Sequence, residues 1–428
     1  MIKSININVE NKVYIHQCRK SNQNHQKLPN TQTTMTITYD KRYTPVNLKD
    51  SNLFKSIKVG KLELPQRVVM APITRMRAHP DQVPNVDGLA AEYYDQRSKR
   101  QGTLIITEAT SISAQAGGYP NVPGIYTKAQ ADEWKKIFER IHNNKSFVFL
   151  QLWNIGRQAS PAYLKAKNLK FIGPSDGLYT GKDSEKEAIG SGNELKSLTK
   201  EEILATVQDY VNSAKLAIEY GADGVEIHGA NGYLLNQFLD PISNKRTDEY
   251  GGNIENRARF TLQVVDALVA AVGADKVGIR LSPFGQFGTM SGNDPLIVAQ
   301  YAYLIGELEK RAKESPQKRL AFIDLVEPRV VDPMAEEGKH NDTGFSNEFV
   351  YSIWNGVIMR SGEYALNNKQ ALKDVNANDR TLLVYGRFFI SNPDLIDRLE
   401  KGWPLNAYDR STFYVPGAKG YTDYPTYS

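Results

Sequence analysis

The segment from His228 to Tyr233, His-Gly-Ala-Asn-Gly-Tyr, carries residue types suited to activating a carbonyl group. It follows residues 224–227, an apolar run that predicts a strand. If the segment forms one helical turn, His228 and Asn231 share a face and can donate to one oxygen. Such donors stabilise the negative charge that grows there when hydride adds to the conjugated carbon. Tyr233, a phenol with an ordinary pKa of about 10, is a candidate general acid. A structural role is the alternative for His228 taken alone, but the ordered set favours catalysis.

A second group of polar residues lies in or at the ends of other predicted strands. Arg280 interrupts an apolar strand, and a buried arginine is costly without a partner. Two interpretations are open: an internal salt bridge, or a positive charge beside a flavin pyrimidine ring, where it would stabilise the reduced anion. Gln151 can pair with the same ring edge, because its amide both donates and accepts.

The elements that must position these residues alternate along the chain from residue 53 onward. Apolar, β-rich runs occupy residues 67–70, 103–107, 147–152, 224–227, 276–281, 320–326, 356–359 and 381–385. Eight strand–helix units predict an α/β fold, a (β/α)8 TIM barrel with an N-terminal β-hairpin over residues 58–64. A doubly wound sheet is the alternative, but no G-x-G-x-x-G follows the first strand and no P-loop motif occurs.

Helix starts and long loops complete this arrangement. Thr127 with Gln130, and Thr199 with Glu202, predict capping boxes. Pro393 predicts another helix start. Apolar faces on two helices are predicted from Ile203, Val207, Tyr210, Val211, Ala214 and Ile218, and from Phe260, Val264, Leu268 and Val272. Residues 154–198, 283–294 and 328–345 are predicted as long loops at the C-terminal mouth of the barrel.

The last two strand ends suggest a phosphate site. Gly362 follows the seventh strand, and Gly386 with Arg387 follows the eighth. Barrels of this kind often bind phosphate there, because glycines admit backbone N–H groups to the oxygens and arginine binds them bidentately. Simple turns at both glycines are the alternative.

Composition excludes several classes of function. Lys and Arg total 53 and Asp and Glu 48, so the formal charge of +5 makes no case for nucleic acid. No apolar run approaches the length of a membrane span. No H-E-x-x-H motif occurs, and no metal site is predicted. No pair of carboxylates converges at the strand ends, which weakens a glycosidase interpretation.

The first residues differ from the rest of the chain. Residues 1–34 are rich in Asn, Gln and Ser, with Glu10 as their one acidic residue, and disorder is expected. We therefore expect a disordered extension over residues 1–50 and a barrel over residues 51–428. Cys18 is the one cysteine, so no disulfide forms within the chain, in keeping with a cytoplasmic protein.

These motifs closely resemble the old yellow enzyme family, in its yeast and fungal branch. The matching segments are residues 71–77, 151–153, 228–241, 246–252, 280–283, 385–389 and 420–427. The resemblance implies bound FMN, reduction of the flavin by NADPH, and then reduction of the C=C bond of an α,β-unsaturated carbonyl compound, an enone or enal. Phenols are implied as further ligands. The oligomeric state is left open, with a homodimer among the alternatives.

The resemblance also implies individual roles. Thr74 hydrogen-bonds the flavin C4 carbonyl, His228 and Asn231 bind the substrate carbonyl, and Tyr233 supplies the proton opposite the flavin hydride. The remaining implied contacts are Pro72, Ile73 and Ala109 along the isoalloxazine, Gln151 and Arg280 at its pyrimidine end, Gly362, Gly386 and Arg387 at the phosphate, and Tyr414 in the substrate pocket.

Some positions depart from the family pattern. Ala109 replaces the usual glycine, and Glu363 stands near the phosphate where asparagine is usual, so its carboxylate must point away. We also expect an aromatic and proline group, Trp153, Phe284, Phe287 and Pro295, to shape the pocket. Two alternatives to an enzyme are a flavoprotein that mainly binds phenols or steroids and a redox-sensing protein. An intact His228, Asn231 and Tyr233 set counts against a pure binder.

Overall fold

Eight parallel strands pair in a closed ring in the computed structural model, which describes residues 38–330, 332–338 and 343–428. In ring order they are β3 (Val68–Met70), β4 (Leu104–Ile106), β6 (Phe147–Trp153), β9 (Gly224–Gly229), β10 (Val277–Leu281), β11 (Phe322–Val326), β12 (Ile358–Ser361) and β13 (Thr381–Tyr385). The last strand pairs with the first, Tyr385 opposite Met70. The predicted (β/α)8 barrel is thereby confirmed.

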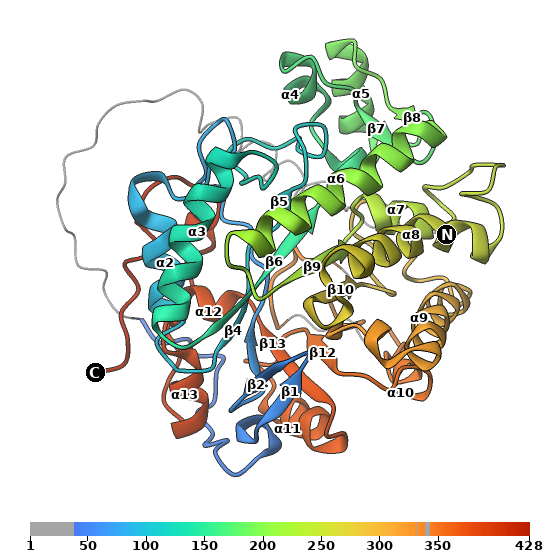
Figure 1. The fold of residues 1–428 in the computed structure, drawn as a ribbon. Helices are drawn as coiled ribbons and strands as arrows, with labels where there is room; N and C mark the ends of the chain where they lie inside the picture. Colours follow the sequence, from blue (N-terminus) through green and yellow to red (C-terminus); the bar gives the residue numbers. More distant parts are fainter. Residues whose placement is uncertain (1–37, 331, 339–342) are drawn as a thin grey trace, which may run out of the picture.

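Helices lie between successive strands and surround the ring (Figure 1). They are α2 (Leu89–Arg97), α3 (Lys128–Asn143), α6 (Lys200–Glu219), α8 (Ile254–Val272), α9 (Ile297–Glu314), α10 (Phe349–Ile353) and α11 (Asn368–Ala377), followed after β13 by α12 (Arg387–Ser391) and α13 (Leu395–Lys401). Both predicted capping boxes form, at the starts of α3 and α6. The predicted apolar faces of α6 and α8 are buried or half-buried against the core.

A hairpin closes the amino-terminal end of the barrel. It consists of β1 (Ile57–Val59) and β2 (Leu62–Leu64), paired antiparallel as predicted. Its turn needs Gly60, which has φ +57° and where a Cβ would overlap the carbonyl oxygen of Asp275. The fully buried Val59 packs with inward-facing barrel residues such as Leu104. Because this end is filled, substrates must reach the barrel interior from the carboxyl-terminal end.

The stretch of residues 154–198 was wrongly expected to be a plain loop. It contains α4 (Pro161–Ala166), α5 (Lys182–Ser191) and a small parallel sheet of β7 (Ile172–Gly173) and β8 (Lys196–Ser197). Figure 1 shows this group at one edge of the molecule. Helix α5 follows Gly181 without a side-chain cap, so the sequence offers no start signal for it, whereas α4 starts at a Ser160 cap followed by Pro161, a signal that the loop expectation overlooked.

A smaller correction concerns the start of the last helix. α13 begins at Leu395, not at Pro393 as the sequence predicts. The side-chain amide of Asn392 donates to the carbonyl of Phe388 at 2.8 Å, so this residue closes α12 instead of opening the next helix.

The described part of the amino-terminal region packs on the carboxyl-terminal elements. The backbone N–H of Asp40 donates to Leu405 at 2.8 Å, and that of Leu48 to Leu399 at 3.1 Å. The side chains of Tyr43 and Leu48 are buried. The boundary expected at residue 50 therefore lies inside a packed segment, while residues 1–37 lie outside the described residues.

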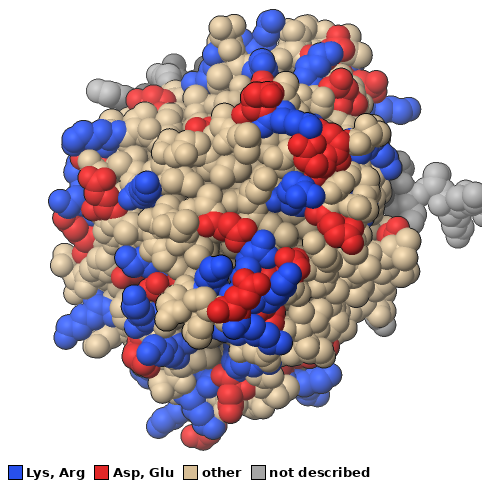
Figure 2. Space-filling model, turned by 45° about the vertical axis from the view of Figure 1, so that its right-hand side comes forward, with Lys and Arg blue, Asp and Glu red and all other residues tan. Residues whose placement is uncertain are grey.

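Two features of the described residues bear on binding to membranes and to nucleic acids. No helix among the described residues is long and apolar enough to cross a membrane. On the face in Figure 2, lysine and arginine alternate with aspartate and glutamate, so no continuous basic surface forms there.

Replacing Thr199 tests the α6 capping box. Its hydroxyl accepts from the Glu202 N–H at 3.2 Å, and the Glu202 carboxylate accepts from the Thr199 N–H at 2.9 Å. We expect Thr199→Ala to lower the free energy of unfolding by about 1 kcal/mol, measured by urea unfolding. Thr199→Ser keeps the hydroxyl and should lose far less; equal losses in the two variants would contradict the capping role.

Candidate active site

A cavity of about 240 Å³ opens at the carboxyl ends of the barrel strands. Every residue expected to hold the flavin or act on substrate lines it: Pro72, Ile73, Thr74, Ala109, Gln151, His228, Asn231, Tyr233, Arg280, Gly362, Gly386, Arg387 and Tyr414. The parallel direction of the strands explains this convergence, because their carboxyl ends all meet at one mouth.

His228 and Asn231 converge through a turn, and the expected helical turn is wrong. Strand β9 continues to Gly229. The next residues form a β-turn in which the Tyr233 N–H donates to the Ala230 carbonyl at 3.2 Å. Its central residues, Asn231 and Gly232, have φ values of 53° and 71°, as in a type I′ turn. Asparagine and glycine tolerate this geometry best, which explains their order in the sequence.

His228 is held as a neutral donor. Its ring is 5% exposed, and burial, aided by the positive charge of Arg280, holds its pKa far below the ordinary value. The N–H of Ala230 points at Nδ1 at 3.4 Å, which makes Nδ1 an acceptor. The proton therefore resides on Nε2, and the ring presents an N–H donor at neutral pH.

Tyr233 is held as a protonated phenol. Its ring contacts Trp153 edge-on at 4.8 Å and His228 at 4.9 Å between centroids. Burial raises its pKa above the ordinary value, and Tyr414 and Asp332 add to the effect. The group therefore keeps its proton until a stronger base, such as a developing carbanion, takes it.

Arg280 fits both of its interpretations. One of its nitrogens forms an ion pair with Asp324, and Nη2 donates to Ser361 Oγ at 3.0 Å. The same side chain lines the cavity. Gln151 also lines the cavity, and its Nε2 donates to Glu226 at 2.7 Å, which leaves its amide oxygen available as an acceptor.

The first strand supplies an apolar wall. Ala71, Pro72 and Ile73 follow β3, and Ala109 faces the cavity after β4. The Glu108 carboxylate accepts from the Arg75 N–H at 3.2 Å, which joins the two segments. This wall suits a flat aromatic ring system.

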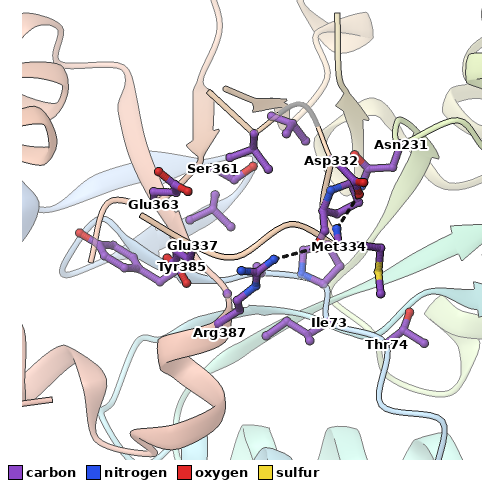
Figure 3. A pocket seen from close by; sticks show the side chains of 18 of the residues that line it. Ile73, Thr74, Asn231, Asp332, Met334, Glu337, Ser361, Glu363, Tyr385 and Arg387 are labelled. Atoms are coloured by element: carbon purple, nitrogen blue, oxygen red, sulfur yellow. Dashed lines mark hydrogen bonds between the residues drawn. The ribbon is translucent and has the colours of Figure 1, made fainter. Parts of the chain in front are cut away.

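The end of the cavity expected to bind phosphate carries the positively charged side chain of Arg387 and two carboxyl groups, Glu337 and Glu363 (Figure 3). Arg387 donates to the Pro333 carbonyl at 2.7 Å, so its guanidinium already binds an acceptor here. Gly362 has φ 156°, and a Cβ there would lie 2.8 Å from Glu327. Glu363 accepts from the Gly338 N–H at 2.9 Å. Burial raises the pKa of Glu337 to about 7, so half of this group is neutral near physiological pH.

The donors and walls of the cavity fit FMN part by part. An apolar wall suits the isoalloxazine, Gln151 and Arg280 suit its pyrimidine edge, and Arg387 beside Gly386 suits a phosphate. Glu363 also lines this end of the cavity, where one of its carboxylate oxygens accepts from the Gly338 N–H.

Some expectations about the cavity were wrong, and some of its residues were missed. Phe287 lines it, and Trp153 lies directly behind Tyr233. Phe284 instead stacks on Phe345 in the core, and Pro295 is exposed. Sequence reasoning missed Asp332, Met334 and Glu337, which line the cavity, and the buried carboxyl groups of Glu226 and Asp324. The sequence does offer one signal for Asp324: like Arg280, it is a charged residue in an otherwise apolar strand.

Comparison with known proteins agrees with this site. The NADH:flavin oxidoreductase / NADH oxidase family matches residues 52–406. Enoate reductase 1 of Kluyveromyces lactis is 57% identical over 387 residues, 90% of this chain and 96% of that protein. A probable NADPH dehydrogenase of Candida albicans is 48% identical over 381 residues, 88% and 91% of the two chains. The crystal structure of Old Yellow Enzyme from Pichia sp. has a TM-score of 0.83 at 46% identity and covers 89% and 95% of the two chains.

Each of these matches spans most of the chain. The chain therefore belongs to the NADH:flavin oxidoreductase / NADH oxidase family, in its fungal old yellow enzyme branch.

Proposed function

We propose that this protein is an FMN-dependent, NADPH-oxidising reductase of the C=C bond in α,β-unsaturated carbonyl compounds. When bound, FMN would supply the redox chemistry, the transfer of hydride from NADPH to the β-carbon of the substrate. One observation carries the proposal: a neutral histidine, an asparagine and a protonated tyrosine line the same cavity as the residues that suit a flavin.

His228 and Asn231 hold the substrate carbonyl in this proposal. Two donors on one oxygen stabilise the negative charge that develops there as hydride arrives. A neutral histidine serves this role well, because it donates a hydrogen bond without protonating the oxygen outright. Tyr233 then gives its proton to the α-carbon, and Tyr414 and Met334 bound the space for the rest of the substrate.

The flavin-side roles are part of the same proposal. Thr74 would donate to the flavin C4 carbonyl, and Gln151 and Arg280 would hold the pyrimidine edge. The wall along the ring would be formed by Pro72, Ile73 and Ala109. The phosphate would be held by Gly362, Gly386 and Arg387.

Enones, enals and phenols are the ligands that this site suits. A protein that only bound phenols or steroids would not need a proton donor such as Tyr233 beside the oxygen-binding pair. We further propose a cytoplasmic location. A chain with one cysteine cannot form an internal disulfide bond, which fits a reducing compartment.

Anaerobic half-reactions test the function directly. The purified protein should be yellow, lose its colour with NADPH, and regain it on addition of 2-cyclohexenone. A colourless preparation that does not take up FMN would overturn the proposal. So would a reduced flavin that oxygen reoxidises and no enone does.

Tyr233→Phe separates the two half-reactions. We expect reduction by NADPH to be nearly unchanged, because it needs no proton from the phenol. Reoxidation by 2-cyclohexenone should slow by about 10²- to 10⁴-fold, the usual contribution of a general acid. Stopped-flow absorbance measures both steps, with Tyr303→Phe on α9 as a control distant from the cavity. Equal slowing of both steps would refute the proton-donor role.

His228→Asn tests the oxygen-binding pair through a ligand. Phenols bind as oxyanions or oxygen acceptors, so loss of the imidazole donor should weaken binding of 4-hydroxybenzaldehyde by about tenfold or more. Titration followed by flavin absorbance measures the affinity. His142→Asn, an exposed histidine on α3 paired with Asp223, is the matched control and should bind normally. Unchanged affinity in His228→Asn would contradict the role.

The lowered pKa of His228 gives a prediction about pH. A base whose folded pKa is depressed takes up its proton only at lower pH, so His228 should stay neutral from about pH 7.5 to about pH 5.5. Nitrogen NMR of labelled histidine should show Nε2 protonated and Nδ1 bare throughout, with His228→Asn assigning the signal. Protonation of both nitrogens as pH falls through about 6.5 would disprove the assignment.

A further inference from the structure

Two fully buried carboxyl groups lie inside the barrel beneath the cavity, and we call Glu226 and Asp324 the buried acid pair. Both side chains have no solvent exposure. Glu226 lies on β9, two residues before His228, so it faces the interior one layer below the histidine. Asp324 lies on β11 directly opposite Arg280, and Arg280 lies opposite His228 on its other side.

The two acids have different partners. Asp324 Oδ2 forms the ion pair with Arg280, while its Oδ1 has no hydrogen-bond partner among the described residues. Glu226 Oε1 accepts from the amide of Gln151 at 2.7 Å, and within the same described part of the chain its Oε2 has no partner. Arg280 and Gln151 both line the cavity, so each acid contacts one of the two residues that suit the flavin pyrimidine edge.

One arginine cannot neutralise two buried carboxylates. Burial, with the nearby charge of Asp324 acting in the same direction, raises the pKa of Glu226 and so favours its protonated form. Burial also raises the pKa of Asp324, but the contact with the guanidinium acts in the opposite direction. The geometry therefore favours an ionised Asp324 in the ion pair and a neutral Glu226 that is bonded through Gln151.

We propose that Asp324 is a positioning residue that sets the reduction potential of the flavin, by offsetting the charge that Arg280 presents to the cavity. This inference rests on the proposed function, because it needs FMN bound beside Arg280. With its charge partly offset, Arg280 stabilises the reduced, anionic flavin less. The bound flavin is then a stronger hydride donor toward the enone. Glu226 contributes shape and a hydrogen bond but no charge.

A purely structural ion pair is the competing account. In that case Asp324 only holds Arg280 in place, and Ser361, which accepts from Nη2, would share this task. The potential of the flavin distinguishes the two accounts, since removal of a charge alters the potential even when the guanidinium does not move.

The test compares Asp324→Asn with Glu226→Gln in the FMN-loaded protein. We expect Asp324→Asn to raise the two-electron potential, shifting the equilibrium with a reference dye toward reduced flavin by about tenfold, or about 30 mV. Glu226→Gln should leave the potential nearly unchanged. Asp266→Asn, which removes a surface carboxylate paired with Arg311, controls for net charge.

Each outcome decides a different claim. An unchanged potential in Asp324→Asn, with FMN bound, would overturn the inference and leave the proposed function intact. A rise in Glu226→Gln equal to that in Asp324→Asn would overturn the assignment of the charge. Failure of the unmodified protein to bind FMN would instead refute the proposed function.

If Asp324→Asn does not fold, Asp324→Ser removes the same charge and leaves room for water. In the infrared spectrum, a protonated carboxyl band lost in Glu226→Gln would support the neutral state; a band unaffected by that change would contradict it.

Discussion

Arg280 lies level with His228 on one side and Asp324 on the other, because three neighbouring parallel strands pair in that register. The rest of the site depends on this buried charge. Burial, aided by the positive charge of Arg280, holds the pKa of His228 low, so the ring stays neutral and able to donate. The ion pair of Arg280 with Asp324 makes burial of its guanidinium tolerable. Its remaining donors reach Ser361 and the cavity.

The fold leaves the carboxyl-terminal end of the barrel as the route by which ligands reach this charge. The β1–β2 hairpin fills the amino-terminal end with apolar side chains, and the helices cover the outside of the ring. The loops at the opposite end then determine the walls of the cavity. Arg157, after β6, donates to the carbonyls of Leu178 and Gly288 and so holds two of these loops together. Arg77 donates to the carbonyls of Phe413 and Gly417 and fixes the segment that carries Tyr414.

Much of this arrangement could be predicted from the sequence, because strand ends in a parallel barrel converge whatever the loops do. The alternation of apolar strands with amphipathic helices was enough to place Gln151, His228, Arg280 and Arg387 at one mouth. The details that failed depend on local backbone geometry. The Asn231–Gly232 pair is itself a sequence signal for a type I′ turn, and the expectation of a helical turn overlooked it. Helix α4 does begin with a start signal, because the Ser160 hydroxyl accepts from the Tyr163 N–H and Pro161 follows, whereas α5 follows Gly181 without a side-chain cap. The partner of Arg280 could not be identified from the sequence, because the strand register that places Asp324 opposite it depends on long-range pairing.

One claim is central: the oxygen-binding pair, His228 and Asn231, and the flavin-binding residues act in a single cavity. A crystal structure of the FMN-loaded protein with a bound phenol tests it most directly. The account predicts that the phenol oxygen lies within hydrogen-bonding distance of His228 Nε2 and the Asn231 amide, with the flavin pyrimidine edge against Gln151 and Arg280. A phenol oxygen bound away from both donors, or a flavin ring outside this cavity, would contradict it.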